Sequence, residues 1–375
     1  MMEGMRTTPR VVVVAGMHRA GTSAVARALV ALGVDLGERL MSADVRMNAR
    51  GFFEDIDVVA VDDALLRAHG ADWKSVALLD AVDWDGEPHA AARAQARLLI
   101  AARVARAATY GCKDPRMARL LPFWQRVFAD AGVADTYVIA VRHPRAVIDS
   151  LTARDGLDPR RSGWLWLTHL LCALRYTQHR PRVIVDYDRL LDSPEQELSR
   201  MARALGAPVP AAGDPAVADY TSRFLAREMR HAQYAAADLD PDTVPPLVPE
   251  AHALAQRLAR DDADPAGPAT LAEIDALCAR LREWSPLLGY AAAVERVADD
   301  MPRVAGELAW ARDSLAAAAI YSEELRNAMG IAQTYNDSLV ATLERKESEL
   351  VAAHATLARL SERVLGRMLL RQTRR

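Results

Sequence analysis

Hydrophobic residues in the first half of the chain alternate between short unbroken runs and longer stretches with helical spacing. Residues 11–15 read Val-Val-Val-Val-Ala, a run that predicts a strand buried on both faces of a parallel sheet. From Thr22 to Leu32 the apolar positions recur at helical spacing, and Gly33 is a typical stop signal. The same patterns predict strands over residues 108–114, 136–141 and 183–186, and helices over residues 56–68, 89–107, 120–132, 145–153 and 162–179. This alternation predicts an α/β fold with a mainly parallel central sheet.

The character of the chain changes after about residue 208. Residues 238–250 and 260–269 are rich in Pro and Asp, which is typical of connectors between short helices. Residues 303–366 contain almost no Pro or Gly and show a heptad spacing of apolar or small residues. One heptad position holds Leu308, Leu315, Met329, Leu343, Leu350, Leu357 and Val364, and the other holds Ala311, Ala318, Leu325, Ala332, Leu339, Ala353 and Leu360.

The heptad repeat predicts a long helix with a coiled-coil face. Ser322, Asn336 and Lys346 interrupt the repeat. A long helix that folds back on the globular part is the alternative. We therefore expect three parts: an α/β domain over residues 1–235, a Pro/Asp-rich helical extension over 236–300, and the long helix over 301–375. The helix is a candidate surface for a second copy of the chain or for another partner.

Composition narrows the class of protein. The net charge is −3 over 375 residues, so the chain carries no overall basic field that would indicate a nucleic-acid partner. The three cysteines lie far apart, which argues against a zinc cluster or a disulfide framework and fits a reducing compartment. No signal-peptide pattern is present, and no apolar stretch approaches the length of a membrane span. We expect a soluble, cytoplasmic protein.

The segment after the first predicted strand has the outline of a phosphate-binding loop. Residues 16–23 read G-M-H-R-A-G-T-S, where a nucleoside-triphosphate P-loop reads G-x-x-x-x-G-K-[ST]. A strand-loop-helix turn directs free backbone N–H groups and the helix dipole at one point, and the guanidinium of Arg19 suits a phosphate. Thr22 stands where the motif lysine would reach the β- and γ-phosphates. The loop therefore indicates either a different phosphate-bearing ligand or a glycine-containing turn without one.

A second cluster follows the third predicted strand. Arg142 comes directly after that strand, and Ser150 lies eight residues later in the following helix. Strand ends beside the first strand-helix loop are where ligands bind in doubly wound sheets. An Arg and a Ser at this place can hold a second phosphate that is separate from the first.

These motifs resemble those of the sulfotransferases that use 3'-phosphoadenylyl sulfate (PAPS). Their motif [KR]-[SA]-G-T-[ST] is matched by R-A-G-T-S at residues 19–23, and their strand-R-x-[PG]-x₅-S motif is matched at residues 142–150. K-D-P at residues 113–115 is similar to a motif of tyrosylprotein sulfotransferases, and Y-D-R-L at residues 187–190 is similar to the Y-[ED]-x-[LM] that ends a later strand. With G-F-F-E-D at residues 51–55, the pattern looks most like bacterial sulfotransferases, over roughly residues 10–195.

The resemblance implies a P-loop-NTPase-like three-layer fold, PAPS as co-substrate without a metal, and transfer of a sulfuryl group to an acceptor hydroxyl. The acceptor that it implies is a carbohydrate or glycoconjugate. The nucleotide-binding residues that it implies are Gly16, His18, Arg19, Ala20, Gly21, Thr22, Ser23, Arg142, Ser150, Tyr187 and Arg230. For His18 a structural hydrogen-bonding role, and for Arg230 a solvated helix face, are the alternatives.

Transfer also needs catalytic groups, and the resemblance supplies candidates for them. Lys113 would contact the transferring sulfuryl group, and Arg19 would stabilise charge on the leaving 5'-phosphate. Glu54 is our first candidate for the general base, because the adjacent phenylalanines could desolvate it and raise its pKa. Glu38 is the alternative base, and Asp55 is a weaker one.

Two other classes of function stay open from the sequence. A small-molecule kinase would need the P-loop lysine and a magnesium-binding carboxylate after a neighbouring strand. A non-catalytic interaction protein would combine a decayed nucleotide fold with a coiled-coil tail. Affinity for adenosine 3',5'-bisphosphate without magnesium, compared with ATP plus magnesium, distinguishes the sulfotransferase from the kinase.

Overall fold

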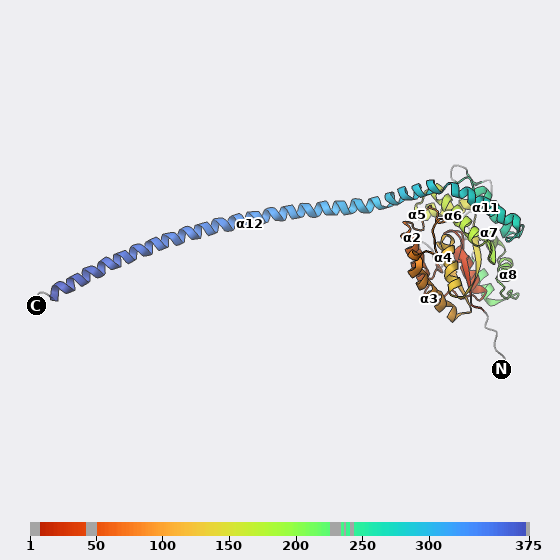
Figure 1. The fold of residues 1–375 in the computed structure, drawn as a ribbon, viewed down its shortest axis with the longest axis horizontal. Helices are drawn as coiled ribbons and strands as arrows, with labels where there is room; N and C mark the ends of the chain where they lie inside the picture. The colour runs from red at the N-terminus through yellow and green to blue at the C-terminus, as the bar shows by residue number, and fades with distance from the viewer. Residues whose placement is uncertain (1–7, 43–50, 226–233, 236–237, 241–243, 373–375) are drawn as a thin grey trace, which may run out of the picture. The chain divides into compact units, whose positions relative to one another are not determined.

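The computed structural model describes residues 8–42, 51–225, 234–235, 238–240 and 244–372 (Figure 1). Contacts divide the chain into two compact units, one that extends to Glu295 and one that begins at Arg296. The second unit consists of the greater part of α12 (Ser285–Gln372), a single helix that begins in the first unit. Each described side chain from residue 296 to 361 is exposed.

A parallel sheet forms the centre of the first unit. Its strands are β1 (Arg10–Ala15), β2 (Thr109–Lys113), β3 (Ala134–Val141) and β4 (Arg182–Asp186), in the order β2-β1-β3-β4. In the register of the sheet, Val13 lies beside Cys112 on one side and beside Tyr137 on the other. The chain first crosses from β1 to β2 and then to β3 on the opposite side of β1, so the switch point of the sheet lies between β1 and β3.

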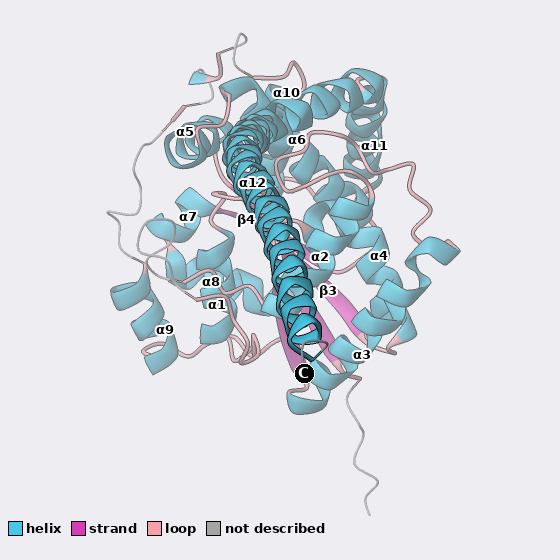
Figure 2. Cartoon of the chain, turned by 90° about the vertical axis from the view of Figure 1, so that its left-hand side faces the viewer, coloured by secondary structure: helices cyan, strands magenta, loops and turns pink. Residues whose placement is uncertain are grey.

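Helices cover both faces of the sheet, as Figure 2 shows for α3 and α4 on one side and α1 and α8 on the other. Val11 and Val13 pack with residues of α2, α3 and α4, whereas Val12 and Val14 pack with α1, α7 and α8. The two sets alternate along β1 because successive side chains of a strand point to opposite faces.

The helices of the described residues follow the strands in sequence. They are α1 (Thr22–Ala31), α2 (Ile56–Ala68), η1 (Glu87–His89), α3 (Ala90–Arg106), α4 (Met117–Asp130), α5 (Pro144–Asp155), α6 (Pro159–Tyr176), α7 (Tyr187–Asp192), α8 (Pro194–Ala204), α9 (Pro215–Asp219), η2 (Tyr220–Phe224), α10 (Val248–Ala259) and α11 (Pro268–Glu283). Helices α10 and α11 pack with α6 in the same hydrophobic core. The region after residue 235 therefore contributes to the core of the first unit.

The predicted fold class is confirmed: the sheet is parallel, it lies between helices, and a long helix ends the chain. That helix begins at Ser285, earlier than the expected residue 301, and continues through Pro302. Proline removes one backbone donor and disfavours a helix interior, but it does not end this helix. No helix of the described residues is both long and apolar enough to cross a bilayer.

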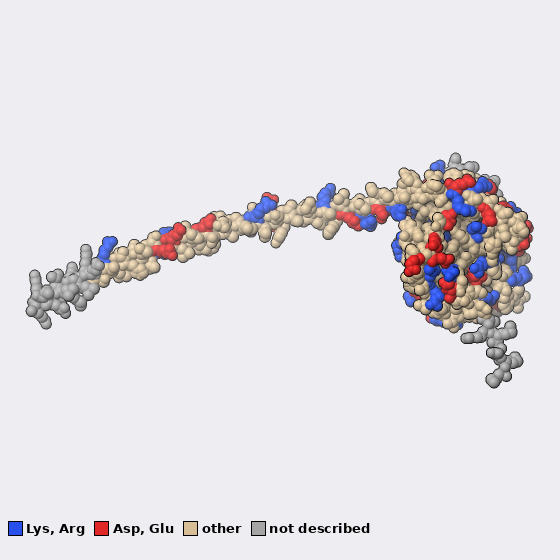
Figure 3. All heavy atoms as spheres, in the orientation of Figure 1, with Lys and Arg blue, Asp and Glu red and all other residues tan. Residues whose placement is uncertain are grey.

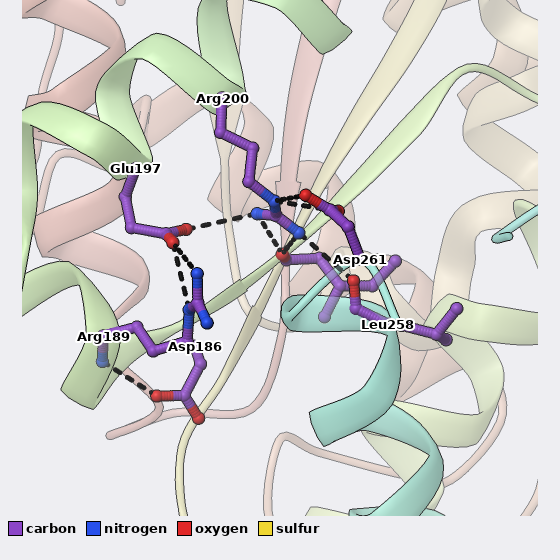
Figure 4. A network of polar contacts seen from close by, with 7 residues as sticks. Asp186, Arg189, Glu197, Arg200, Leu258 and Asp261 are labelled. Carbon is purple, nitrogen blue, oxygen red and sulfur yellow. Dashed lines mark hydrogen bonds and ion pairs between the residues drawn. The ribbon is translucent and has the colours of Figure 1, made fainter. Parts of the chain in front are cut away.

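An arginine covers the outer edge of the sheet at β4. Arg200 donates two hydrogen bonds of 2.8 Å from Nη1 and Nη2 to the carbonyl oxygen of Ile184. Figure 4 shows this guanidinium between Glu197 and Asp261, with which it forms ion pairs of 3.1 and 2.9 Å. Glu197 is buried and also accepts from Arg189, so the arginine over the edge strand is held from several sides.

Candidate functional site

The loop that joins β1 to α1 has backbone angles that only special residues adopt easily. Gly16 and Gly21 have φ angles of +149° and +88°, and Arg19 has a φ of +69°. Among the described residues, α1 has no side-chain cap at Gly21 and no acidic residue in its first turn. The first N–H groups of a helix have no partner within the helix, so those of this turn, together with the positive end of the helix dipole, suit an anion.

Tyr187 packs directly against Gly21. A Cβ atom placed on Gly21 would lie 2.3 Å from Tyr187 Cδ2, and one placed on Gly16 would lie 2.6 Å from the carbonyl oxygen of Ala140. Both glycines are thus required by space as well as by φ. The tyrosine begins α7 directly after β4, which brings the Y-D-R-L segment next to the phosphate loop.

Gly21→Ala is expected to destabilise the protein by about 2–5 kcal/mol, because it adds an overpacking cost to the cost of a left-handed residue. The measurement is thermal unfolding of the purified variant. Gly132→Ala is the matched control: its φ is +66°, and a Cβ there meets no described atom within 4 Å. Equal destabilisation of the two variants would show that contact with Tyr187 is unimportant.

The two phosphate motifs meet in space. Arg19 Nε donates to Ser150 Oγ at 2.7 Å across 131 residues of sequence, and Arg142 Nη1 donates to the carbonyl oxygen of Arg19 at 3.3 Å. The Arg142 guanidinium carbon lies 4.7 Å from the centre of the Tyr187 ring. Trp166 Nε1 donates to the carbonyl oxygen of Arg142 at 3.0 Å and fixes the end of β3.

The guanidinium groups of Arg19 and Arg142 bring positive charge into a partly buried region of the protein. Arg142 is 6% exposed, and its Nε is buried without a hydrogen-bond partner among the described atoms. Burial lowers the pKa of Arg19, and the nearby guanidinium groups of Arg154 and Arg142 lower it further. An anion bound here would relieve this repulsion.

Lys113 and Glu54 form a buried ion pair beside the same loop. Lys113 ends β2 and is 3% exposed, and Glu54 is 4% exposed. Besides its contact with Glu54 Oε1, the Lys113 ammonium donates to the carbonyl oxygen of Phe52 at 2.9 Å and to Ser23 Oγ at 3.3 Å. Glu54 Oε2 is buried without a hydrogen-bond partner among the described atoms.

Burial raises the pKa of Glu54, the Lys113 charge opposes this rise, and Asp114 adds to it. Asp114 is fully buried and accepts two hydrogen bonds from Arg116 Nη1, at 2.9 and 3.0 Å. Burial and the neighbouring Asp114 raise the pKa of Asp62 well above its ordinary value. Glu54 and Asp62 thus both lie within the electrostatic influence of Asp114, and among the described ion pairs Lys113 contacts Glu54.

The other two carboxylates that the sequence offered as bases have different surroundings. Glu38 is an exposed residue that pairs with Arg106 at the end of α3. Asp55 caps α2 by accepting from the backbone N–H of Asp57 at 3.0 Å. Its two oxygens also accept from Arg103 at 2.6 and 3.1 Å, and Tyr110 donates to it at 2.9 Å. Both carboxylates are thus paired with arginines of α3.

His18 and Ala20 lie inside the loop. Ala20 is buried, and its N–H donates to the carbonyl oxygen of Met17 at 3.1 Å. The His18 ring lies 4.7 Å from the Trp73 ring, and burial, with Arg116 next in effect, lowers its pKa well below 6.5. The imidazole is therefore neutral near pH 7. Arg230 lies outside the described residues.

Comparison with models of known protein families gives a match. The sequence model described as the sulfotransferase family matches residues 9–211, a little over half of the chain. None of the curated proteins compared with the chain matches it.

Two solved structures are similar to this chain, each at 17% identity. The "Sulfotransferase Domain from the Curacin Biosynthetic Pathway" has a TM-score of 0.33, with 56% of this chain and 77% of that chain covered. The "Sulfotransferase Domain from the Synechococcus PCC 7002 Olefin Synthase" has a TM-score of 0.34, with 74% of this chain and 96% of that chain covered.

Proposed function

Because the chain belongs to the sulfotransferase family, we propose that it transfers a sulfuryl group from PAPS to an acceptor hydroxyl, with a carbohydrate as the acceptor class. The observation that carries this proposal is the hydrogen bond between Arg19 of the first loop and Ser150 of the second motif. It joins two anion-binding elements that come from different strand ends. PAPS carries its phosphosulfate and its 3'-phosphate as two separate anionic groups, which suits a divided site.

In this proposal the loop from Gly16 to Ser23 holds the 5'-phosphosulfate, and Arg142 with Ser150 holds the 3'-phosphate. Tyr187 supports the junction by packing on Gly21 and beneath the Arg142 guanidinium. The N–H groups at the start of α1 and the guanidinium of Arg19 stabilise the charge that develops on the leaving phosphate oxygen. No metal ligand is assigned.

The reaction is a displacement at sulfur. The acceptor oxygen forms a bond to sulfur while the bond from sulfur to the 5'-phosphate oxygen breaks, and adenosine 3',5'-bisphosphate leaves. Glu54 takes the proton of the acceptor hydroxyl as general base, which typically contributes about 10²–10⁴-fold to a rate. Alignment of the sulfuryl donor and the acceptor hydroxyl within one site supplies much of the remaining rate enhancement.

The ion pair between Lys113 and Glu54 gives these two residues linked roles. Lys113 can exchange Glu54 for the incoming sulfuryl oxygens, because its ammonium has three donors and a flexible stem. The charge of Lys113 lowers the pKa of Glu54. When Lys113 contacts the donor instead, the pKa of Glu54 rises and the carboxylate becomes a stronger base.

Trp73 supports a cyclic acceptor. Its ring lies beside His18, and the Lys74 ammonium and the Arg154 guanidinium each lie 5.7 Å from its centre. An aromatic face of this kind packs well against the C–H face of a sugar ring. Incubation with sulfur-labelled PAPS and a panel of glycans, followed by identification of the labelled product, tests the acceptor class.

Adenosine 3',5'-bisphosphate is expected to raise the melting temperature by about 5 °C or more at 100 times its dissociation constant, without added magnesium. The measurement is a thermal-shift titration of the full chain, with ATP plus magnesium as the parallel titration. A larger shift with ATP and magnesium would favour the kinase. No shift with either nucleotide would favour the non-catalytic interaction protein.

A further inference from the structure

After Pro302, helix α12 carries a heptad repeat that three polar residues interrupt, and every described side chain between Arg303 and Ser361 is exposed. With Leu308 at position a and Ala311 at position d, the register continues without insertion to Leu360. We call these positions the a/d seam. The seam consists of Val304, Leu308, Ala311, Leu315, Ala318, Ser322, Leu325, Met329, Ala332, Asn336, Leu339, Leu343, Lys346, Leu350, Ala353, Leu357 and Leu360.

The seam leaves large apolar side chains in water. Leu308 is 70% exposed, Leu315 is 73% exposed and Met329 is 66% exposed. A helix of this length draws most of its stability from packing of an apolar face rather than from helix propensity. Figure 3 shows the same segment with scattered charges on a mainly uncharged surface. The apolar face therefore needs an occupant.

We propose that the occupant is the same seam of a second copy of this chain, in a parallel and in-register two-stranded coiled coil. A strict seven-residue repeat keeps one stripe facing a partner only if the helices supercoil to the left around each other. A second copy placed in register meets this requirement over the whole seam, since the two repeats are then identical at every layer.

The polar positions favour this pairing. Asn336 occupies an a position, where an asparagine paired with its equivalent specifies register and a two-stranded parallel state. Lys346 occupies a d position, flanked by Glu347 of the second copy and by its own Glu349, to which its ammonium lies at 2.8 Å. The parallel arrangement thus gives Asn336 and Lys346 suitable neighbours.

The residues that flank the seam are also complementary. In a parallel dimer each g residue lies beside the e residue five positions later in the other helix. This rule pairs Glu307 with Arg312 of the second copy and Glu349 with His354 of the second copy. Between Val304 and Ser361, no g residue meets an e residue of the same charge under this rule.

The same rule accounts for apolar residues beside the seam. It pairs Tyr335, which is 67% exposed, with Val340 of the second copy, which is 46% exposed. It also pairs Tyr321 with Arg326 of the second copy, an aromatic ring with a guanidinium. Ile331 lies at position c, outside seam and flanks, although it is 74% exposed. This residue is the matched control for seam substitutions.

The test measures the mass of the full chain in solution by light scattering or sedimentation. The wild type is expected at twice the 41.0 kDa of one chain. The double variant Leu343→Asp, Leu350→Asp is expected at the mass of one chain, and Ile331→Asp is expected to keep the double mass. A monomeric wild type, a higher oligomer, or equal dissociation by Ile331→Asp would overturn the proposal.

Cross-linking tests the orientation. Leu315→Cys and Leu357→Cys, examined in separate proteins under mild oxidation, are each expected to form a disulfide-linked dimer. Asp313→Cys, at the outward f position, and the wild type are expected to stay uncross-linked. Absence of a dimer with both seam cysteines, while the wild-type mass is doubled, would indicate an antiparallel or different pairing and would overturn the parallel arrangement. Neither readout depends on sulfuryl transfer, so this proposal and the proposed function can fail separately.

Discussion

Glu54→Gln is expected to reduce the rate of sulfuryl transfer by about 10²–10⁴-fold, the usual contribution of a general base. The amide keeps the shape of the side chain and can still accept a hydrogen bond from Lys113, but it cannot take a proton. Affinity for adenosine 3',5'-bisphosphate should change little, because the anion-binding loop and Arg142 are untouched. The measurements are single-turnover transfer rates and calorimetric binding.

The pH dependence of the rate gives a second measurement of the same residue. Burial raises the pKa of Glu54, and the base works only as the carboxylate. The wild-type rate should therefore increase as the pH rises through this raised pKa and decrease as the pH falls below it. This limb of the profile should be absent from the Glu54→Gln variant.

Glu38→Gln is the matched control for this experiment. Glu38 pairs with Arg106 on the exposed surface, so its loss should leave the rate unchanged. Normal turnover by Glu54→Gln together with loss of turnover by Glu38→Gln would move the base to Glu38.

Arg142→Ala is expected to weaken binding of adenosine 3',5'-bisphosphate by about 10–100-fold, since a hydrogen bond to a charged group contributes about 1.5–3 kcal/mol. The guanidinium is nearly buried, and its Nε has no protein partner among the described atoms, so an anion is the natural acceptor. Calorimetric titration measures the affinity, and a thermal melt confirms that the variant is folded.

Arg145→Ala tests whether the effect is specific to position 142. Arg145 lies three residues later at the start of α5, where it forms an ion pair of 2.8 Å with Asp149 and is partly exposed. Its removal takes away the same charge without touching Ser150 or Arg19. Comparable loss of affinity in the two variants would mean that the 3'-phosphate responds to the overall positive charge of this region and not to a contact with Arg142.

The strand-helix order could be read from the sequence because buried parallel strands are continuous apolar runs, and each loop motif follows one of them. The expected helix over residues 56–68 agrees with α2, whose N-cap is Asp55. The start of α12 could not be read in the same way, because Pro302 is a breaker by local rules and its removal of one donor is tolerated within a long helix.

The side-chain contacts of the site were harder to predict from the sequence than the fold. Glu54 and Asp55 are neighbours with similar carboxyl groups, yet one contacts Lys113 and the other contacts Arg103 and Tyr110. Their difference depends on which way each side chain leaves the turn before α2, and on a lysine nearly sixty residues away. The contact of Tyr187 with Gly21 likewise has no local signal, since it arises from the position of β4 in the sheet.

The guanidinium of Arg200 has a consequence for how copies of this chain can associate. An unpaired edge strand offers carbonyl acceptors to any extended segment that approaches it, and this is a common route to aggregation. At β4 the carbonyl oxygen of Ile184 already accepts two hydrogen bonds, from a side chain that Glu197 and Asp261 hold in place. Strand addition at this edge would have to displace that arginine first. In the dimer that we propose, this arginine would oppose the joining of two sheets through their β4 edges.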